Sequence, residues 1–175
     1  MIDKYDALRA GIYYEVFETL EPLLEDIGEL IEQNPFSERI KYLLERPSLS
    51  RIPVLNLHDE MSPPNCLGTS FWIADVGKLD YPYHAYSYEL DEHMGKTENS
   101  AKSLFNSNLE RRISGAFCFS FDTRIEGWHS GIYLGTIGKE HILFGQHGHG
   151  KDFGLETEWV FVCPEYYIPR SLKKD

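Results

Sequence analysis

The sequence lacks the long apolar run and the basic leader that mark membrane and secreted proteins. No stretch of about 18 apolar residues occurs in the chain, so we expect no membrane span. The first residues, Met1 to Asp6, show no basic segment followed by an apolar one, so we expect no signal peptide. These features predict a cytoplasmic protein, or one that is exported without a classical signal peptide.

Positive charge is also scarce. The chain has 17 Lys and Arg against 28 Asp and Glu, a formal net charge of −11. Nucleic-acid affinity is built largely from cationic contacts to phosphate, so we expect no nucleic-acid partner. The hydrophobic share of 42% nevertheless predicts a folded domain with a sizeable core.

Cysteine and the familiar catalytic motifs are few. The three cysteines form an odd set without metal-type spacing, which favours a reducing compartment: Cys66, Cys118 and Cys163. No Gly-x-Ser-x-Gly elbow and no phosphate-binding loop occurs, so no motif supports a serine hydrolase or a nucleotide-binding function.

The first 48 residues predict a helical extension. Apolar residues recur at three- and four-residue steps from residue 3 to about 33, and Pro22 predicts a kink near Thr19 to Glu21. A second helix is predicted from about Ser37 to Glu45. A packing layer is the simpler interpretation of this acidic arm, and a protein partner at these helices is a possible alternative.

The middle of the chain predicts further helices. A short extended piece at 52–57 leads into a helix over about 66–76, which Gly77 would end in a left-handed conformation. Residues 78–96, rich in Tyr, Asp and His, are interpreted as a surface excursion that walls one side of a cleft. A helix is then predicted over 97–112.

After Gly115 the apolar period changes from helical to two residues. This alternation predicts a half-buried strand at about 117–121. Further strands of an antiparallel meander are predicted at about 129–135, 141–147 and 158–163, with a turn at 136–139 and a loose polar tail from Pro169. Helices first and an antiparallel meander second indicate the α+β class, with residues 49–175 as one domain after the extension.

The stretch from Ser62 to Trp72 is the strongest candidate for chemistry. Pro63 and Pro64 favour an extended approach, and Asn65 is a preferred N-cap. Cys66 therefore falls in the first helical turn, where the helix dipole favours a thiolate. A small buried cysteine that only packs at a helix start is the alternative.

A nucleophilic cysteine needs a base, and His129 is the best candidate because it begins a strong strand. His147, near the end of the next strand, is our choice for the group that orients the His129 ring, with Gln146 and His149 as rivals. A metal site at His141, His147 and His149 competes for the same residues, but no familiar ligand spacing occurs. We expect no cofactor.

Taken in order, these segments resemble a known family. Asn65-Cys66 at a helix start, a Gly115-Ala116 strand and the stretch His129-Ser130-Gly131-Ile132-Tyr133-Leu134-Gly135 are similar to the papain-like cysteine peptidases of the NlpC type. These are bacterial cell-wall endopeptidases and amidases, whose common Asp-Cys-Ser-Gly and Gly-Asp are Asn-Cys-Leu-Gly and Gly-Ala here. Asn-Cys is also similar to the lecithin:retinol acyltransferase relatives.

The resemblance implies a papain-like fold over about residues 62–163, with the nucleophile helix packed on an antiparallel sheet. It implies Cys66 as nucleophile, His129 as base and His147 as the third residue. The expected function is amide hydrolysis of a peptide or a peptidoglycan fragment, without a metal. A non-catalytic binding module on the same fold and an acyltransferase are the alternatives.

Overall fold

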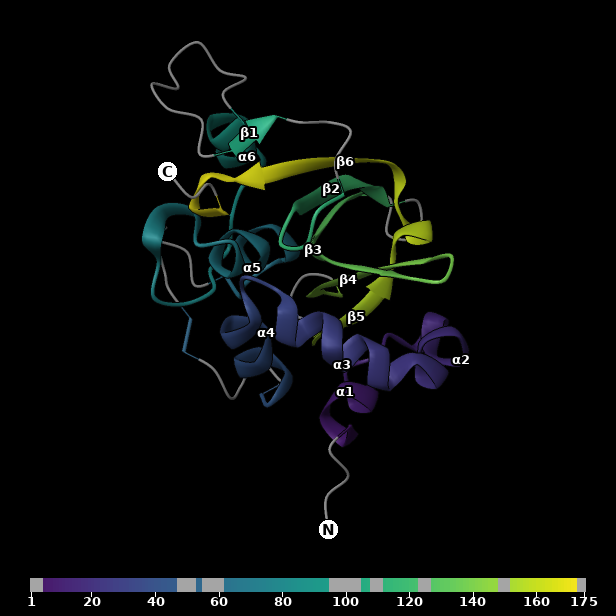
Figure 1. The fold of residues 1–175 in the computed structure, drawn as a ribbon. Coiled ribbons are helices and arrows are strands. Elements are labelled where there is room, and N and C mark those ends of the chain that lie inside the picture. The colour runs from purple at the N-terminus through teal and green to yellow at the C-terminus, as the bar shows by residue number, and fades with distance from the viewer. Residues whose placement is uncertain are drawn as a thin grey trace.

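The computed structural model describes residues 5–46, 53–54, 62–94, 105–107, 112–122, 127–147 and 152–172. Its helices are α1 (Asp6–Ala10), α2 (Phe17–Leu20), α3 (Leu24–Gln33), α4 (Ser37–Leu44), α5 (Cys66–Ile73) and α6 (Ser87–Met94). Its strands are β1 (Phe105–Ser107), β2 (Phe117–Asp122), β3 (Gly127–Ile137), β4 (Glu140–Gln146), β5 (Phe153–Thr157) and β6 (Val162–Pro169). Figure 1 shows these elements in one orientation.

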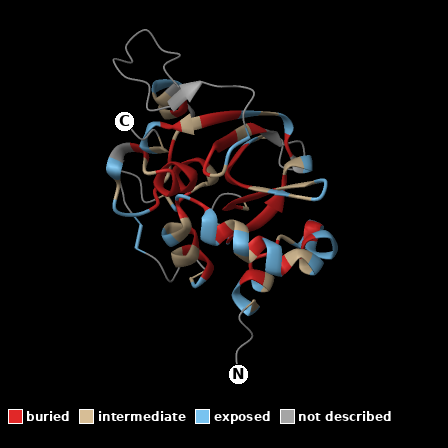
Figure 2. Cartoon of the chain, in the orientation of Figure 1, coloured by how far each residue is buried: buried red, intermediate tan, exposed pale blue. Residues whose placement is uncertain are grey.

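The strands form one antiparallel sheet in the order β1-β6-β2-β3-β4-β5. Figure 2 shows α5 buried along its length and the outer sides of α3 and α4 exposed. Phe117, Ile132 and Phe144 share the sheet face that belongs to the main core. Cys118 and Tyr133 belong to a second cluster on the other face. The prediction of a half-buried strand at 117–121 is therefore wrong for its first residues, because both faces are covered. The α+β class is confirmed.

The N-terminal helices share the main core with the sheet. The break predicted at Pro22 is confirmed by a 3-10 turn at Glu21–Leu23. A second break was not predicted: the chain leaves α1 at Gly11, and Ile12 forms a parallel bridge with Leu155 of β5. Strand β5 is at the edge of the sheet, and its free backbone groups need hydrogen-bond partners. The segment around Ile12 provides them, which explains why the helical pattern is interrupted there. The boundary at residue 48 stays a prediction.

Several local predictions need correction. Helix α5 ends at Ile73, and Asp75 and Lys78 take the left-handed conformation expected of Gly77. Residues 78–96 are more than a surface excursion, because they contain α6 and buried side chains such as Leu90. The predicted helix over 97–112 is replaced at residues 105–107 by β1, and most of its remaining residues, like most of 52–57, lie outside the described part.

The end of the chain also differs from the prediction of one strand over 158–163. Strands β5 and β6 are separated by a 3-10 turn at Glu158–Val160. Pro164 lies within β6, where the pairing register with β2 shifts and Cys163 has a positive φ of 49°. Such an irregularity tolerates a residue without an N–H, so Pro164 does not end the strand. Among the described helices, none is long and apolar enough to cross a membrane.

Candidate active site

Helix α5 begins at Cys66, directly after the predicted N-cap. The side chain of Asn65 accepts a hydrogen bond from the Gly68 N–H at 2.9 Å, so the predicted cap is confirmed. The same side chain donates to the Ala85 carbonyl at 2.7 Å and accepts from the Ala85 N–H at 3.2 Å. Asn65 thus fixes the start of the helix and the segment that passes beside it.

Gly68 permits this close approach. A Cβ added at Gly68 would lie 1.9 Å from the Tyr83 carbonyl oxygen, a distance that no side chain can occupy. The backbone of Tyr83 to Ala85 therefore runs directly over the first turn of α5. The predicted wall of a cleft over 78–96 is present here, since Ala85 and Leu90 line a hollow beside Cys66.

Gln146 of β4 binds the segment around Cys66 from the side of the sheet. Its side chain is fully buried, accepts from the Thr69 hydroxyl at 2.7 Å and donates to the Pro64 carbonyl at 2.8 Å. One residue of β4 thereby binds both the approach to α5 and its first turn. Gln146 was considered as a partner for His129, and the structure gives it this different task.

The imidazole of His129 lies near enough to Cys66 for the two groups to interact. His129 lies on β3, is 2% exposed, and packs against the Phe161 ring with centroids 5.1 Å apart. The Cys66 thiol acts on the ring closely enough to raise the pKa of His129. The buried Nδ1 atom has no regular hydrogen-bond partner among the described residues, and the thiol is 3.8 Å from the Trp128 carbonyl oxygen. The two predicted site residues are therefore brought together.

The other ring nitrogen is held by a residue that the sequence analysis missed. Nε2 of His129 is 2.8 Å and 3.0 Å from the two carboxylate oxygens of Glu156, whose side chain is 1% exposed. With Glu156 accepting from Nε2–H, Nδ1 is the ring nitrogen that remains for the thiol. Glu156 lies on β5, two strands away from His129, so its side chain must cross β4.

Two glycines open that path. Gly131 of β3 is paired with Gly145 of β4, on the same face of the sheet as His129 and Glu156. A Cβ added at either glycine would be 3.5 Å from Oε1 of Glu156. The absence of two side chains therefore lets a carboxylate reach over the middle strand.

The charge on this ring is set by its surroundings. Burial lowers the pKa of His129, but the Glu156 carboxylate and the Cys66 thiol together outweigh it and raise the pKa to about 10. The geometry thus favours an imidazolium that persists at neutral pH between a sulfur and a carboxylate.

His147 does not occupy the position expected of it. Its ring contacts Tyr13 edge-on, with centroids 4.5 Å apart, and its backbone N–H donates to the Asp152 carbonyl at 3.0 Å. The prediction that His147 orients His129 is therefore wrong in this geometry, and Glu156 takes the place. The prediction looked for the partner of His129 on the adjacent strand β4, whereas Glu156 lies on β5, on the far side of β4.

The alternative metal site receives no support from the part of the chain that can be described. His141 is hydrogen-bonded within its own hairpin to Tyr133 and Thr136, each at 3.0 Å, and His149 lies outside the described residues. The described residues contain no group of three side chains suited to a metal ion.

One feature of the sequence could have identified Glu156. Phe153-Gly154-Leu155-Glu156-Thr157 alternates apolar residues with a glycine and a carboxylate, which is typical of a short strand. All five residues are buried. A carboxylate inside such a strand needs a cationic or hydrogen-bonding partner, and that requirement could have directed attention to it.

A pocket of about 360 Å³ lies beside Cys66. Its lining is mainly apolar and consists of Asn65, Cys66, Leu67, Ala85, Leu90, Asp91, Phe119 and Trp128. The Phe119 and Trp128 rings are stacked with centroids 5.0 Å apart, and Trp128 is 59% exposed. Cys66 thus borders a hollow that has one aromatic wall.

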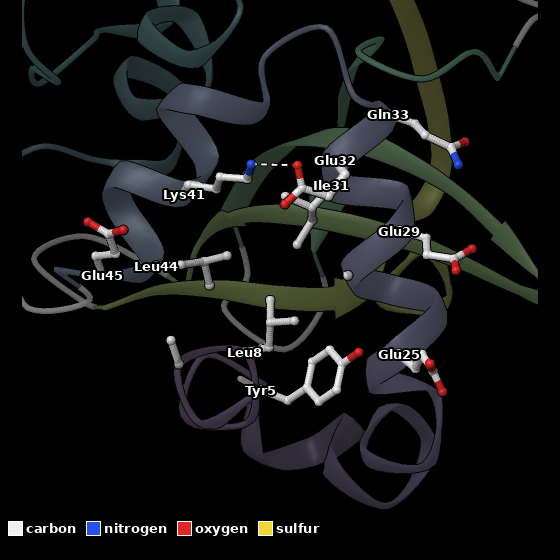
Figure 3. Close-up of a pocket in the computed structure, with 12 residues that line it drawn as sticks. Tyr5, Leu8, Glu25, Glu29, Ile31, Glu32, Gln33, Lys41, Leu44 and Glu45 are labelled. Atoms are coloured by element: carbon white, nitrogen blue, oxygen red, sulfur yellow. Dashed lines mark hydrogen bonds and ion pairs between the residues drawn. The ribbon is translucent and has the colours of Figure 1, made fainter. Parts of the chain in front are cut away.

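A larger groove of about 590 Å³ lies elsewhere, between α1, α3 and α4 (Figure 3). Leu8, Ile31 and Leu44 form its apolar floor, and Figure 3 shows Glu32 paired with Lys41 at its edge. None of the described residues that line it is a cysteine or a histidine. The protein partner expected at these helices stays a prediction.

Comparison with known proteins adds no relative. No protein-family model, no curated protein and no solved structure matches this chain. The resemblance to the NlpC-type peptidases therefore rests on the order of the residues in the sequence and stays a prediction.

Proposed function

We propose that this protein is a cysteine-dependent amide hydrolase, with a peptide or a peptidoglycan fragment as substrate. Cys66 is the nucleophile, His129 the acid and base, and Glu156 the residue that orients and charges the imidazole. The observation that carries the proposal is the buried His129 ring, which interacts with Cys66 and is bonded at Nε2 by a carboxylate. Nucleophile, base and orienting group form the arrangement that thiol catalysis requires.

In the first half-reaction the Cys66 thiolate attacks the amide carbonyl carbon, and a C–S bond forms while the carbonyl oxygen becomes an oxyanion. The Cys66 and Leu67 amides at the start of α5 have no acceptor among the described residues, so the Cys66 N–H is available to that oxyanion. Nδ1–H of His129 then protonates the leaving nitrogen. The C–N bond breaks, which releases the amine and leaves a thioester on Cys66.

In the second half-reaction the neutral Nδ1 takes a proton from water as the water oxygen attacks the thioester. The tetrahedral intermediate collapses with loss of the sulfur, and the carboxylic acid is released. Glu156 accepts from Nε2–H throughout, so the same nitrogen faces the reacting atoms in both steps.

Cysteine labelling and activity test the proposal together. Burial raises the pKa of the Cys118 thiol well above its ordinary value, and Cys163 is exposed on β6, so the chain supplies internal references. With limiting iodoacetamide at pH 6, Cys66 should be alkylated at least about tenfold faster than Cys163. Peptide mapping by mass spectrometry measures both rates.

Activity is measured by mass spectrometry on a peptide mixture and on muropeptides, with and without added amines and lipids. Cys66→Ala should abolish product formation, and Cys163→Ala should leave it unchanged. Full activity of Cys66→Ala would refute the assignment. Equal, slow alkylation of both thiols would instead support the binding module, and products joined to the amine or lipid would support the acyltransferase.

A further inference from the structure

Among the described residues that line the pocket beside Cys66, Asp91 is the single ionisable side chain apart from the thiol. Asp91 lies on α6 at the rim, among Leu67, Leu90 and the stacked rings of Phe119 and Trp128. No hydrogen bond or ion pair to Asp91 is formed by any described residue. An acidic group without a partner, at the edge of an otherwise apolar hollow, is suited to a ligand that ends in a positive charge.

A nearby carboxylate on the same helix has a different environment. Glu89, on the same helix, accepts from the Tyr83 hydroxyl at 3.1 Å and from the Tyr86 N–H at 3.0 Å. Glu89 therefore holds α6 against the segment that crosses α5, and it does not line the pocket. Asp91 makes no such internal contact and faces the hollow.

We propose that this pocket binds a substrate side chain with an aliphatic stem and a cationic end, as in lysine, and that Asp91 pairs with the cation. This inference rests on the proposed function. Because Cys66 itself lines the pocket, the side chain should belong to the residue whose carbonyl carbon the sulfur attacks. The apolar walls take the stem and the rim carboxylate takes the charge.

The charge of the whole chain acts in the same direction. A net charge of −11 attracts cationic peptides at long range and repels acidic ones. This long-range attraction acts on the total charge of a peptide. Only a local contact can favour a cationic side chain at one particular position of that peptide. The test therefore varies a single position.

Three peptidyl chloromethyl ketones that differ only in the residue next to the ketone provide that test: lysine, norleucine and glutamate. Norleucine keeps an aliphatic stem without the amine, so it isolates the charge. Each reagent forms a C–S bond to Cys66 and releases chloride, and intact mass with peptide mapping gives the rate. The lysine reagent should react about fivefold faster than norleucine, and glutamate slowest, at low salt.

Variants separate the carboxylate from its surroundings. Asp91→Asn should reduce the ratio of the lysine rate to the norleucine rate to about one. Glu92→Gln, which removes the same charge from the next residue of α6 outside the pocket lining, should keep the preference. The preference should also decrease at about 0.5 M salt, because an exposed pair is screened.

The outcomes distinguish the two levels of inference. Equal rates for lysine and norleucine, or a preference that survives Asp91→Asn, would overturn the assignment of the pocket while Cys66 still reacts. If no reagent alkylates Cys66 faster than it alkylates Cys163, the proposed function itself fails.

Discussion

Replacing Glu156 by Gln should remove the charge that holds His129 protonated while keeping an oxygen that accepts from Nε2–H. In the wild type the pKa of His129 rises from 6.5 to about 10, because Glu156 and Cys66 outweigh burial. Without the carboxylate, burial dominates and the pKa should fall below its ordinary value. The variant ring should then be neutral at pH 7.5.

The change has a defined effect on stability. A pKa that is raised in the folded state stabilises it fully below the unfolded pKa near 6.5, and the gain is lost as the pH rises through about 10. For a buried ion pair of this kind, the folding free energy lost when the carboxylate is removed should be on the order of 3 to 5 kcal/mol. The free energy of unfolding of the wild type relative to Glu156→Gln should therefore be largest at and below pH 6.5 and should decrease toward pH 10.

Urea unfolding followed by tryptophan fluorescence between pH 6 and 10 measures this difference. Glu140→Gln is the matched control, because Glu140 is a partly exposed carboxylate at the start of β4 and makes no ion pair with any described residue. The control should follow the wild-type pH dependence. A wild-type minus Glu156→Gln difference that is flat across this range, or that grows with pH, would refute the proposed coupling between Glu156 and His129.

Two further substitutions test the supports of the site. In Gly145→Ala the new Cβ would lie 2.9 Å from the Ser130 carbonyl oxygen, so the variant should lose about 1 to 3 kcal/mol of stability and react more slowly at Cys66; unchanged chemical denaturation and alkylation would contradict this. Gln146→Met leaves the Pro64 carbonyl without its donor, which should cost about 1 to 3 kcal/mol and slow Cys66 alkylation. An unaltered melting temperature would show that this buried contact is dispensable.

The sequence was sufficient for the parts of the site that local chemistry determines. Asn65 caps a helix through its own side chain, and Cys66 follows it, so two adjacent residues and two prolines were enough to place the thiol. His129 lies near the start of β3, which begins at Gly127, two residues before the predicted start. The α+β class followed from the same change of period, from helical to two.

The third residue could not be found in the same way. Choosing His147 assumed that the partner of His129 lies on the adjacent strand, whereas Glu156 reaches it over the glycines of β3 and β4. That contact depends on the register of three strands, and a one-residue slip in any of them would reverse the faces. Strand β5 was also missed, because its five residues are too short to give a firm period.

The origin of the raised pKa has a consequence for the reaction. An imidazolium with a pKa of about 10 is a weak acid and donates its proton poorly to a leaving amine. Part of that pKa, however, comes from Cys66, and this part disappears once the sulfur has formed its bond to the carbonyl carbon. The ring should therefore become a stronger acid at the step where the amine must be protonated. In the proposed reaction Glu156 alone would then keep the ring oriented, so that the ring binds the proton tightly before the sulfur attacks and releases it afterwards.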